Sequence, residues 1–271
     1  MPPVPRDTPP GGTRPLATTR TGTGERLVLV HGFTQTGRSW QPVVRELAGP
    51  HEVVTVALPG HGRSAGTRAR DLDDAGRLVA AAGGAATYVG YSMGGRVVLH
   101  AAFAVPELVH RLVIVGTNPG IEDTSERERR RLADEALAAR LAGPGEDRLT
   151  LDEFLAEWLA APLFAHLNEA AAGLAARREN TTAGLAGALR TLGVGTQRYE
   201  SPRLRALGMP VLVLAGELDT TYDALGRRLA AHLGANATFA SLPGVGHAAP
   251  FEAPGRFAAL VEAWLASHPA P

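Results

Sequence analysis

A serine framed by glycines is the most informative feature of this 271-residue sequence. The stretch Gly90-Tyr91-Ser92-Met93-Gly94-Gly95 fits the G-x-S-x-G pattern, in which a serine projects from a tight turn and can act as a nucleophile. Glycine is frequent here, 32 of 271 residues, so the pattern gains weight only from its context. A β-branched run precedes it and an apolar helical stretch follows it, as such a serine requires. We therefore predict that Ser92 is a catalytic residue.

Two later loops supply residues that could activate this serine. A catalytic serine needs a histidine to take its proton and an acid to orient that histidine, and here the expected chain order is serine, acid, histidine. The loop Gly216-Glu217-Leu218-Asp219 follows one apolar run, and His247 follows the last such run in a glycine-rich loop. We predict a triad of Ser92, Asp219 and His247. Glu217 competes with Asp219 for the acid role, and spacing alone does not decide between them.

Two backbone N–H groups are expected to form an oxyanion hole beside the serine. One belongs to Met93, the next residue along the chain, and the other to Phe33, in the loop after the first clear apolar run. The imidazole of His31, at the start of that loop, is more simply explained by packing. A further loop over residues 58–64 carries His61 among glycines and a proline, and we assign that histidine no chemistry.

The surrounding sequence predicts the elements that must hold these residues. Short β-branched runs alternate with helical patterns, which is typical of an α/β fold with a mostly parallel sheet and helices on both faces. The expected strands are Leu27–Val30, Val53–Ala57, Thr87–Gly90, Leu112–Val115, Val211–Leu214 and Ala237–Leu242. The expected helices lie near residues 40–48, 70–82, 93–104, 222–233 and 254–266. The three triad loops then share the carboxyl edge of the sheet, where such sheets bind ligands.

The alternation stops between about residues 122 and 201, where helical patterns follow one another. They cover Glu126–Leu141, Leu151–Leu159 and Glu169–Leu192, which predicts a helical cap over the carboxyl edge of the sheet. At the other end of the chain, the first residues are rich in Pro, Gly, Thr and Arg, which favours a flexible tail, with a short edge strand near residues 16–22 as the alternative. The predicted organisation is a tail at 1–24, a core at 25–121 and 202–271, and a cap insertion at 122–201.

Composition excludes several classes of function. The 45% hydrophobic content supports a folded core, and 27 basic against 27 acidic residues give no net charge that would favour nucleic acid or an anionic membrane. The absence of cysteine excludes a thiol nucleophile, a disulfide framework and Cys-ligated metals. Without a signal-like start or a run of about 18 apolar residues, we expect a cytoplasmic protein with no membrane span. We also expect a small-molecule substrate, no nucleic-acid partner, no cofactor or metal, and a monomer in preference to an oligomer.

These motifs together resemble the α/β-hydrolase superfamily. The stretches HGF, PGHGRS, GYSMGG and GELD and the late GH all have counterparts in that family, and the resemblance covers residues 25–268. It implies an α/β-hydrolase fold with an inserted helical cap. It does not fix the reaction, because this fold hosts esterases, carbon–carbon hydrolases, dehalogenases and lyases.

A second set of residues, mostly in the cap, resembles the more specific family of 2-succinyl-6-hydroxy-2,4-cyclohexadiene-1-carboxylate synthases of menaquinone biosynthesis. This resemblance rests on Arg96, on Asn118-Pro119-Gly120-Ile121, and on cap residues that include Arg130, Asp134, Trp158, Arg178 and Asn180. By similarity to that family, the residues that contact substrate are Tyr91, Arg96, Arg130, Trp158 and Arg178.

The resemblance implies a carbon–oxygen lyase. The enzyme would eliminate pyruvate from 2-succinyl-5-enolpyruvyl-6-hydroxy-3-cyclohexene-1-carboxylate, with the triad as general base and no acyl-enzyme. Arginine suits the carboxylates of such a substrate because its planar guanidinium binds them through two parallel hydrogen bonds. The alternative is a serine hydrolase that uses the same triad on esters or carbon–carbon bonds.

Overall fold

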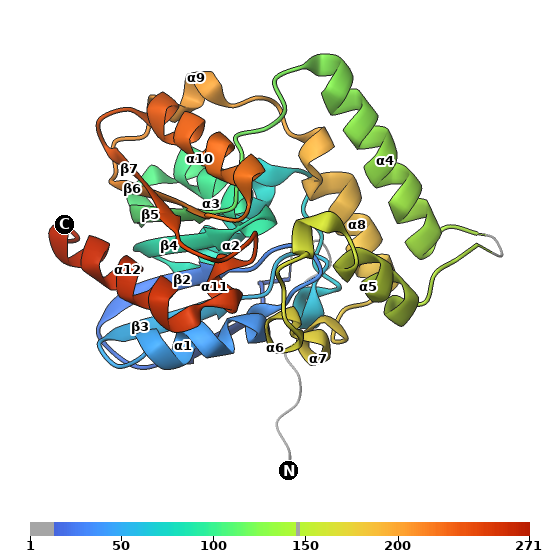
Figure 1. Cartoon of the computed structure of the whole chain (residues 1–271), viewed down its shortest axis with the longest axis horizontal. Helices are drawn as coiled ribbons and strands as arrows, with labels where there is room; N and C mark the ends of the chain where they lie inside the picture. The colour runs from blue at the N-terminus through green and yellow to red at the C-terminus, as the bar shows by residue number, and fades with distance from the viewer. Residues whose placement is uncertain (1–13, 145–146) are drawn as a thin grey trace, which may run out of the picture.

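The computed structural model describes residues 14–144 and 147–271, and a seven-stranded sheet forms its centre (Figure 1). The strands are β1 (Thr18–Thr21), β2 (Glu25–Val30), β3 (His51–Val56), β4 (Ala86–Tyr91), β5 (Val109–Val115), β6 (Val211–Gly216) and β7 (Ala237–Leu242). Their order across the sheet is β1-β3-β2-β4-β5-β6-β7. Strands β2 to β7 are parallel and β1 runs antiparallel to β3, which confirms the predicted mostly parallel sheet.

Strand β1 lies inside the segment predicted as a flexible tail. Thr18 pairs with Val56 and Thr21 with Val53, and the side chain of Leu16 is buried in the core. The edge strand considered as the alternative therefore forms, and it supplies partners to the backbone of β3 that would otherwise lie unpaired at the sheet edge. The first part of the predicted tail, residues 1–13, lies outside the described residues.

Helices cover both faces of the sheet, as the sequence predicts (Figure 1). One face carries α1 (Gln41–Leu47), α11 (Ala249–Glu252) and α12 (Pro254–Ser267), and the other carries α2 (Leu72–Gly83), α3 (Met93–Ala104) and α10 (Thr220–Leu233). Successive strand residues alternate between these faces. In β2, Val28 and Val30 pack with the α3 side, whereas Leu27 and Leu29 pack with the α12 side. Because both faces are covered, the central strands β2, β4, β5 and β6 are mostly apolar.

Between β5 and β6 the chain leaves the sheet and forms a helical cap at one end of it (Figure 1). The cap consists of α4 (Thr124–Ala142), α5 (Leu151–Leu159), α6 (Glu169–Ala172), α7 (Leu174–Arg177) and α8 (Thr182–Leu192), after which α9 (Ser201–Leu204) leads back to β6. Its buried residues, among them Ala138, Phe154 and Leu185, belong to the same apolar cluster as the α3 side of the sheet. The cap is therefore packed onto the core.

The cap differs from the prediction over residues 169–192, where three helices replace the single one expected. Gly173 adopts a left-handed conformation, with φ of 59°, and ends α6, because glycine takes this conformation at little cost. Thr181 then begins α8 by accepting a hydrogen bond from the Gly184 N–H at 3.1 Å. Asn180 lies in the turn between α7 and α8. These breaks decide which cap side chains face the sheet.

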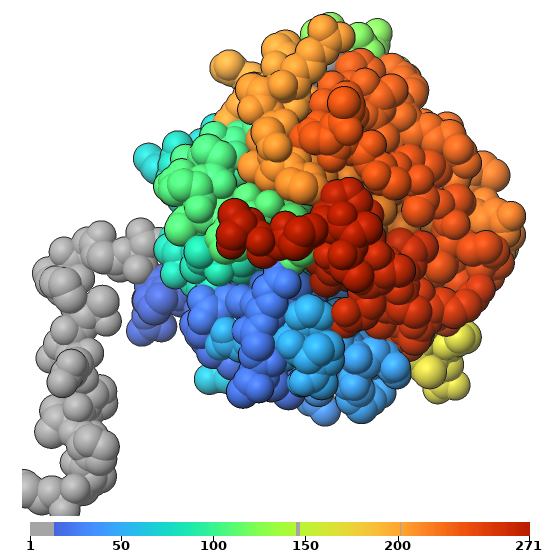
Figure 2. All heavy atoms as spheres, turned by 90° about the vertical axis from the view of Figure 1, so that its left-hand side faces the viewer, coloured from blue at the N-terminus to red at the C-terminus, as the bar shows by residue number. Residues whose placement is uncertain are grey.

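The end of the molecule opposite the cap is covered by core elements (Figure 2). In that view the C-terminal segment, red, lies against the N-terminal strands and helix, blue, and few cap residues are visible. Within the described residues, no helix is both long and apolar enough to cross a membrane.

Two imidazoles are buried near the carboxyl edge of the sheet. His31 Nε2 accepts a hydrogen bond from the Leu58 N–H at 3.1 Å, and its Nδ1 lies 2.8 Å from the Gly32 carbonyl oxygen. His61 Nδ1 lies 3.0 Å from the Pro59 carbonyl oxygen, and its Nε2 is buried with no partner among the described residues. Burial lowers the pKa of His61 to about 4 and also lowers the pKa of His31. Both rings pack between loops, as expected for His31.

We expect His61 to make the fold sensitive to acid. The unfolded chain binds a proton at this ring near pH 6.5 and the folded chain only near pH 4, so stability present above pH 6.5 is lost as the pH falls between these values. The shift corresponds to about 3 kcal/mol, of which about 2 kcal/mol is lost by about pH 5. The free energy of unfolding is measured in urea at about pH 7.5 and at about pH 5. Its decrease between these pH values should be about 2 kcal/mol smaller in His61→Asn than in the wild type. The asparagine amide can still donate to the Pro59 carbonyl oxygen, so the variant keeps that hydrogen bond.

The matched control for this experiment is His166→Asn. His166 is exposed, so its replacement should leave the acid-induced loss of stability as it is in the wild type. The same loss in His61→Asn as in the wild type would show that the acid sensitivity arises from other groups.

Candidate active site

Ser92 stands at a sharp turn between β4 and α3. Its φ of 52° and ψ of −113° form a strained conformation for a residue with a side chain, of the kind that collects at functional sites. The turn closes because its neighbours lack side chains. A Cβ at Gly94 would collide with the carbonyl oxygen of Val30, and one at Gly95 would collide with Thr117. The structure thus contains the strand, turn and helix that the sequence predicts around Ser92.

His247 and Asp219 form a hydrogen-bonded chain with Ser92. His247 Nε2 lies 3.3 Å from Ser92 Oγ, and His247 Nδ1 lies 2.7 Å from Asp219 Oδ2. Asp219 is fixed because it also caps α10, where its Oδ1 accepts the Tyr222 N–H at 3.1 Å. With Nδ1 donating to the carboxylate, Nε2 is left as an acceptor for the serine proton. The structure therefore brings the three predicted triad residues together in the expected order.

Glu217, the rival acid, points elsewhere. Its carboxylate accepts the Gly244 N–H at 2.8 Å and so holds the loop that leads to His247. The turn after β6 separates the two acids, since the Asp219 N–H bonds back to the Gly216 carbonyl oxygen at 3.1 Å. Of the two candidates, Asp219 is the one that contacts the imidazole.

Phe33 and Met93, the predicted oxyanion-hole residues, both line a cavity next to Ser92. Met93 is the first residue of α3, so its N–H has no carbonyl partner within the helix. Phe33 lies in a tight loop after β2, in which the Gly32 N–H donates to the Gln35 side chain at 3.0 Å. Both N–H groups are thus on backbone that borders the serine, and their role in holding an oxyanion stays a prediction.

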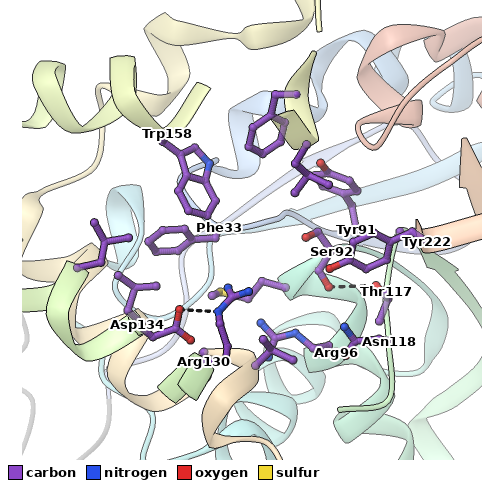
Figure 3. A pocket seen from close by; sticks show the side chains of 18 of the residues that line it. Phe33, Tyr91, Ser92, Arg96, Thr117, Asn118, Arg130, Asp134, Trp158 and Tyr222 are labelled. Atoms are coloured by element: carbon purple, nitrogen blue, oxygen red, sulfur yellow. Dashed lines mark hydrogen bonds and ion pairs between the residues drawn. The ribbon is translucent and has the colours of Figure 1, made fainter. Parts of the chain in front are cut away.

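This cavity has a volume of about 400 Å³ and lies between the serine and the cap (Figure 3). Aromatic side chains form much of its wall. Phe33 and Trp158 lie side by side with ring centroids 5.1 Å apart, while Tyr91 and Tyr222 lie near the serine. Burial raises the pKa of the Tyr222 hydroxyl, which keeps that group neutral. The predicted contacts Tyr91 and Trp158 are therefore both at the cavity.

Three arginines line the same cavity, and Figure 3 shows two of them, Arg96 and Arg130, side by side. Arg96 is buried and donates to the Leu192 carbonyl oxygen at 2.7 Å, while Arg130 pairs with Asp134 at 2.9 Å. The third, Arg177, is also buried. Burial lowers the pKa of Arg96 and of Arg177 to about 10, so both keep their charge at neutral pH. Arg130 is partly exposed, whereas Arg96 and Arg177 are buried with neutral hydrogen-bond partners, and two such cations in one cavity favour an anionic ligand.

Arg178, which the sequence predicts as a substrate contact, does not reach the cavity. It is exposed and pairs with Asp152 at 2.8 Å on the surface of the cap. Its neighbour Arg177 lines the cavity instead. Consecutive helical residues point about 100° apart, and Arg177 is the last residue of α7. The resemblance implies that Arg178 contacts substrate, whereas in the structure Arg177 is the member of this pair that lines the cavity.

Two further lining residues have no counterpart in the predicted site. Tyr222 comes three residues after Asp219, in the first turn of α10, and that spacing from the acid is the signal that could have found it. Thr117 follows β5 and donates from its hydroxyl to the Ser92 carbonyl oxygen at 3.0 Å (Figure 3). In residues 14–144 and 147–271, no group of three or more His, Asp or Glu side chains is placed to hold a metal ion.

The sheet topology, the serine turn and the hydrogen-bonded chain from Ser92 to Asp219 define a class of protein. The model of the family described as Alpha/beta hydrolase family matches residues 27–260. The chain therefore belongs to the α/β-hydrolase family, and the fold predicted from its sequence is confirmed.

Relatives within the family make the resemblance more specific. The chain is 31% identical over 247 residues to 2-succinyl-6-hydroxy-2,4-cyclohexadiene-1-carboxylate synthase of Serratia proteamaculans, covering 88% of this chain and 92% of the relative. It is 35% identical over 215 residues to the protein of that name from Salmonella schwarzengrund, covering 76% and 82%. The solved structure of MenH from S. aureus matches with a TM-score of 0.83 and 26% identity, over 93% of this chain and 98% of that one. A thermophilic esterase from Thermogutta terrifontis, with a TM-score of 0.75, 24% identity and 94% of each chain covered, shares the fold.

Proposed function

We propose that this chain is a 2-succinyl-6-hydroxy-2,4-cyclohexadiene-1-carboxylate synthase, a lyase that eliminates pyruvate from 2-succinyl-5-enolpyruvyl-6-hydroxy-3-cyclohexene-1-carboxylate. The observation that carries the proposal is that Arg96, Arg130 and Arg177 line the same cavity as the Ser92 hydroxyl. A substrate with several carboxylates needs such partners when it leaves water. The relatives of that name support the same reaction. The proposal includes a small anionic substrate. It also includes a location in the cytoplasm and a role in menaquinone biosynthesis.

In this proposal the triad works as a general base. Asp219 holds His247 so that Nε2 takes the hydroxyl proton while the Ser92 oxygen removes a proton from the substrate ring. The electron pair of that C–H bond forms the ring double bond between C2 and C3, the existing C3–C4 double bond shifts to C4–C5, and the C5–O bond to the enolpyruvyl group breaks. His247 returns a proton as the leaving enolate becomes pyruvate. The N–H groups of Phe33 and Met93 hold the negative charge that builds on the conjugated succinyl carbonyl.

Replacing Arg96 or Arg130 by alanine is expected to lower kcat/KM for pyruvate release about 30- to 150-fold. The loss leaves a substrate carboxylate unpaired in the cavity, which costs about 2–3 kcal/mol in the transition state. Lysine at either position should recover only part of the loss, because an ammonium keeps the charge but not the planar fork. The measurement is kcat/KM for pyruvate release from the enolpyruvyl substrate.

Arg178→Ala is the matched control, since Arg178 belongs to the same cap but lies on its surface. Its kcat/KM should stay within about twofold of wild type, because exposed ion pairs contribute little. Labelling of Ser92 by a small neutral fluorophosphonate should keep its wild-type rate in the Arg96 and Arg130 variants, because this probe has no carboxylate. Equal losses in both assays would mean that the arginines support the fold. A wild-type protein that releases no pyruvate would refute the proposed reaction.

A further inference from the structure

Thr34, the residue after Phe33, has an unfavourable backbone conformation. Its φ is 68°, and within the described residues it shares a positive φ among non-glycine residues only with Ser92. For a β-branched residue this conformation is an outlier, and it persists only where surrounding contacts enforce it. Thr34 is completely buried, so those contacts come from the protein. The loop that carries the Phe33 N–H is therefore held in place by residues that lie outside this loop.

The contacts on Thr34 come from the cap. The Asn180 side-chain amide donates through Nδ2 to the Thr34 carbonyl oxygen at 2.6 Å, and Arg177 donates to the Thr34 hydroxyl. The two cap residues lie 143 and 146 positions from Thr34 in the sequence, so the contact joins distant parts of the chain. Both hydrogen bonds are made at a residue next to the predicted oxyanion-hole donor.

Asn180 makes further contacts that fix its orientation. Its Nδ2 also donates to the Arg177 carbonyl oxygen at 2.9 Å, and its Oδ1 accepts the Gly62 N–H at 2.9 Å. The amide group thus uses both its donor and its acceptor side, and a flipped amide would place its NH₂ against the Gly62 N–H. Asn180 is 5% exposed, so water offers little replacement for these bonds. One cap side chain therefore joins the loop after β2, the loop at Gly62 and the end of α7.

We propose that Asn180 is a positioning residue for the oxyanion hole: it holds Thr34 in its strained conformation and thereby aims the Phe33 N–H at the cavity. The inference rests on the proposed function, in which that N–H carries charge in the transition state. It follows that the oxyanion hole is complete only when the turn between α7 and α8 packs against the loop after β2. Asn180 itself does not line the cavity, so it acts through the loop.

The expected consequence of losing Asn180 is a change in kcat more than in KM. Without the Nδ2 donor the Thr34 carbonyl oxygen is buried without a partner, and the strain at Thr34 favours a relaxed loop. A displacement of the Phe33 N–H by about 1 Å is enough to lose on the order of 10²-fold in rate. Because the oxyanion contact strengthens in the transition state, Asn180→Ala should lower kcat about 10- to 100-fold and change KM less than about threefold.

Two readouts test this inference, and one of them needs no substrate. Amide hydrogen exchange in the peptide that covers residues 31–36 should become at least about tenfold faster in Asn180→Ala, because the loop is released. Asn180→Asp keeps the acceptor for Gly62 but turns an oxygen toward the Thr34 carbonyl, so it should be no more active than Asn180→Ala. The matched control is Asn168→Ala, which removes a cap asparagine that only begins α6 and leaves exchange at 31–36 unchanged.

The outcomes separate this inference from the proposed function. Unchanged hydrogen exchange at residues 31–36 in Asn180→Ala would overturn the positioning role of Asn180. A wild-type kcat in Asn180→Asp would also overturn it, because the hydrogen-bond donor to Thr34 would then be unimportant. Equal changes in Asn168→Ala would also overturn it, since they would reflect general loosening of the cap. If wild type releases no pyruvate, the proposed reaction fails, whereas faster exchange and slower fluorophosphonate labelling of Ser92 in Asn180→Ala would still support the positioning role.

Discussion

Ser92→Ala is expected to lower kcat for pyruvate release on the order of 10³-fold or more. The variant removes the oxygen that lies 3.3 Å from His247 Nε2, and with it the base that the proposed elimination requires. His247→Ala should cause a loss of the same order, because residues that act as a unit do not contribute additively. The hydrogen bond of the Ser92 hydroxyl is to His247, so its loss should change the melting temperature by only a few degrees.

The kinetic loss must be separated from unfolding. We expect kcat and the melting temperature, measured on the same preparation, to change independently in Ser92→Ala. Ser267→Ala, at the end of α12, is the matched control and should behave as wild type in both measurements. Activity of Ser92→Ala within about tenfold of wild type would remove the serine from the mechanism, because removal of a triad member costs far more.

The central strands could be predicted because both faces of the sheet are covered. Residues such as Leu112 and Val113 are buried on opposite sides, so the strand has to be a continuous apolar run. Strand ends were predicted less well. Strand β2 begins with two polar residues, Glu25 and Arg26, whose side chains reach solvent. Arg26 pairs there with Glu52 at 2.7 Å. Ends of this kind depend on pairing between distant segments, which local apolar patterns do not record.

The interruption of the cap helix between α7 and α8 could not be predicted either, and the reason is similar. Local propensity allows helix through most of residues 169–192, and the turn at Asn180 is stabilised by hydrogen bonds to Thr34 and Gly62, which lie far away in the sequence. The choice between Arg177 and Arg178 depends on that turn. The resemblance can therefore indicate that this part of the cap supplies an arginine, while tertiary contacts decide which arginine faces the cavity.

The triad was more accessible to prediction than the cap. Each of its members follows a strand of the parallel part of the sheet, and the carboxyl ends of parallel strands meet at one edge of the sheet. Order along the chain therefore translates directly into proximity in space. What spacing could not decide was the acid, because Glu217 and Asp219 occupy one turn and only its hydrogen bonds direct one carboxylate to His247 and the other to Gly244.

Asp219→Asn should therefore lower kcat by on the order of 10³- to 10⁴-fold, whereas Glu217→Gln should stay within about threefold of wild type. An asparagine at position 219 can still accept the Tyr222 N–H and begin α10, so the fold should keep its stability. Its NH₂ group would face His247 Nδ1, however, and favour the tautomer that carries its proton on Nε2. That nitrogen could then no longer accept the proton of Ser92.

Glu217→Gln is the matched control because it makes the same chemical change two residues away in the same turn. The glutamine oxygen can still accept the Gly244 N–H, so the loop before His247 should keep its position. Both variants should be compared by kcat for pyruvate release and by fluorophosphonate labelling of Ser92, which depends on the same imidazole. If the larger loss occurred in Glu217→Gln, the acid role would pass to Glu217. If neither variant lost activity, orientation of His247 by a carboxylate would not contribute to the rate.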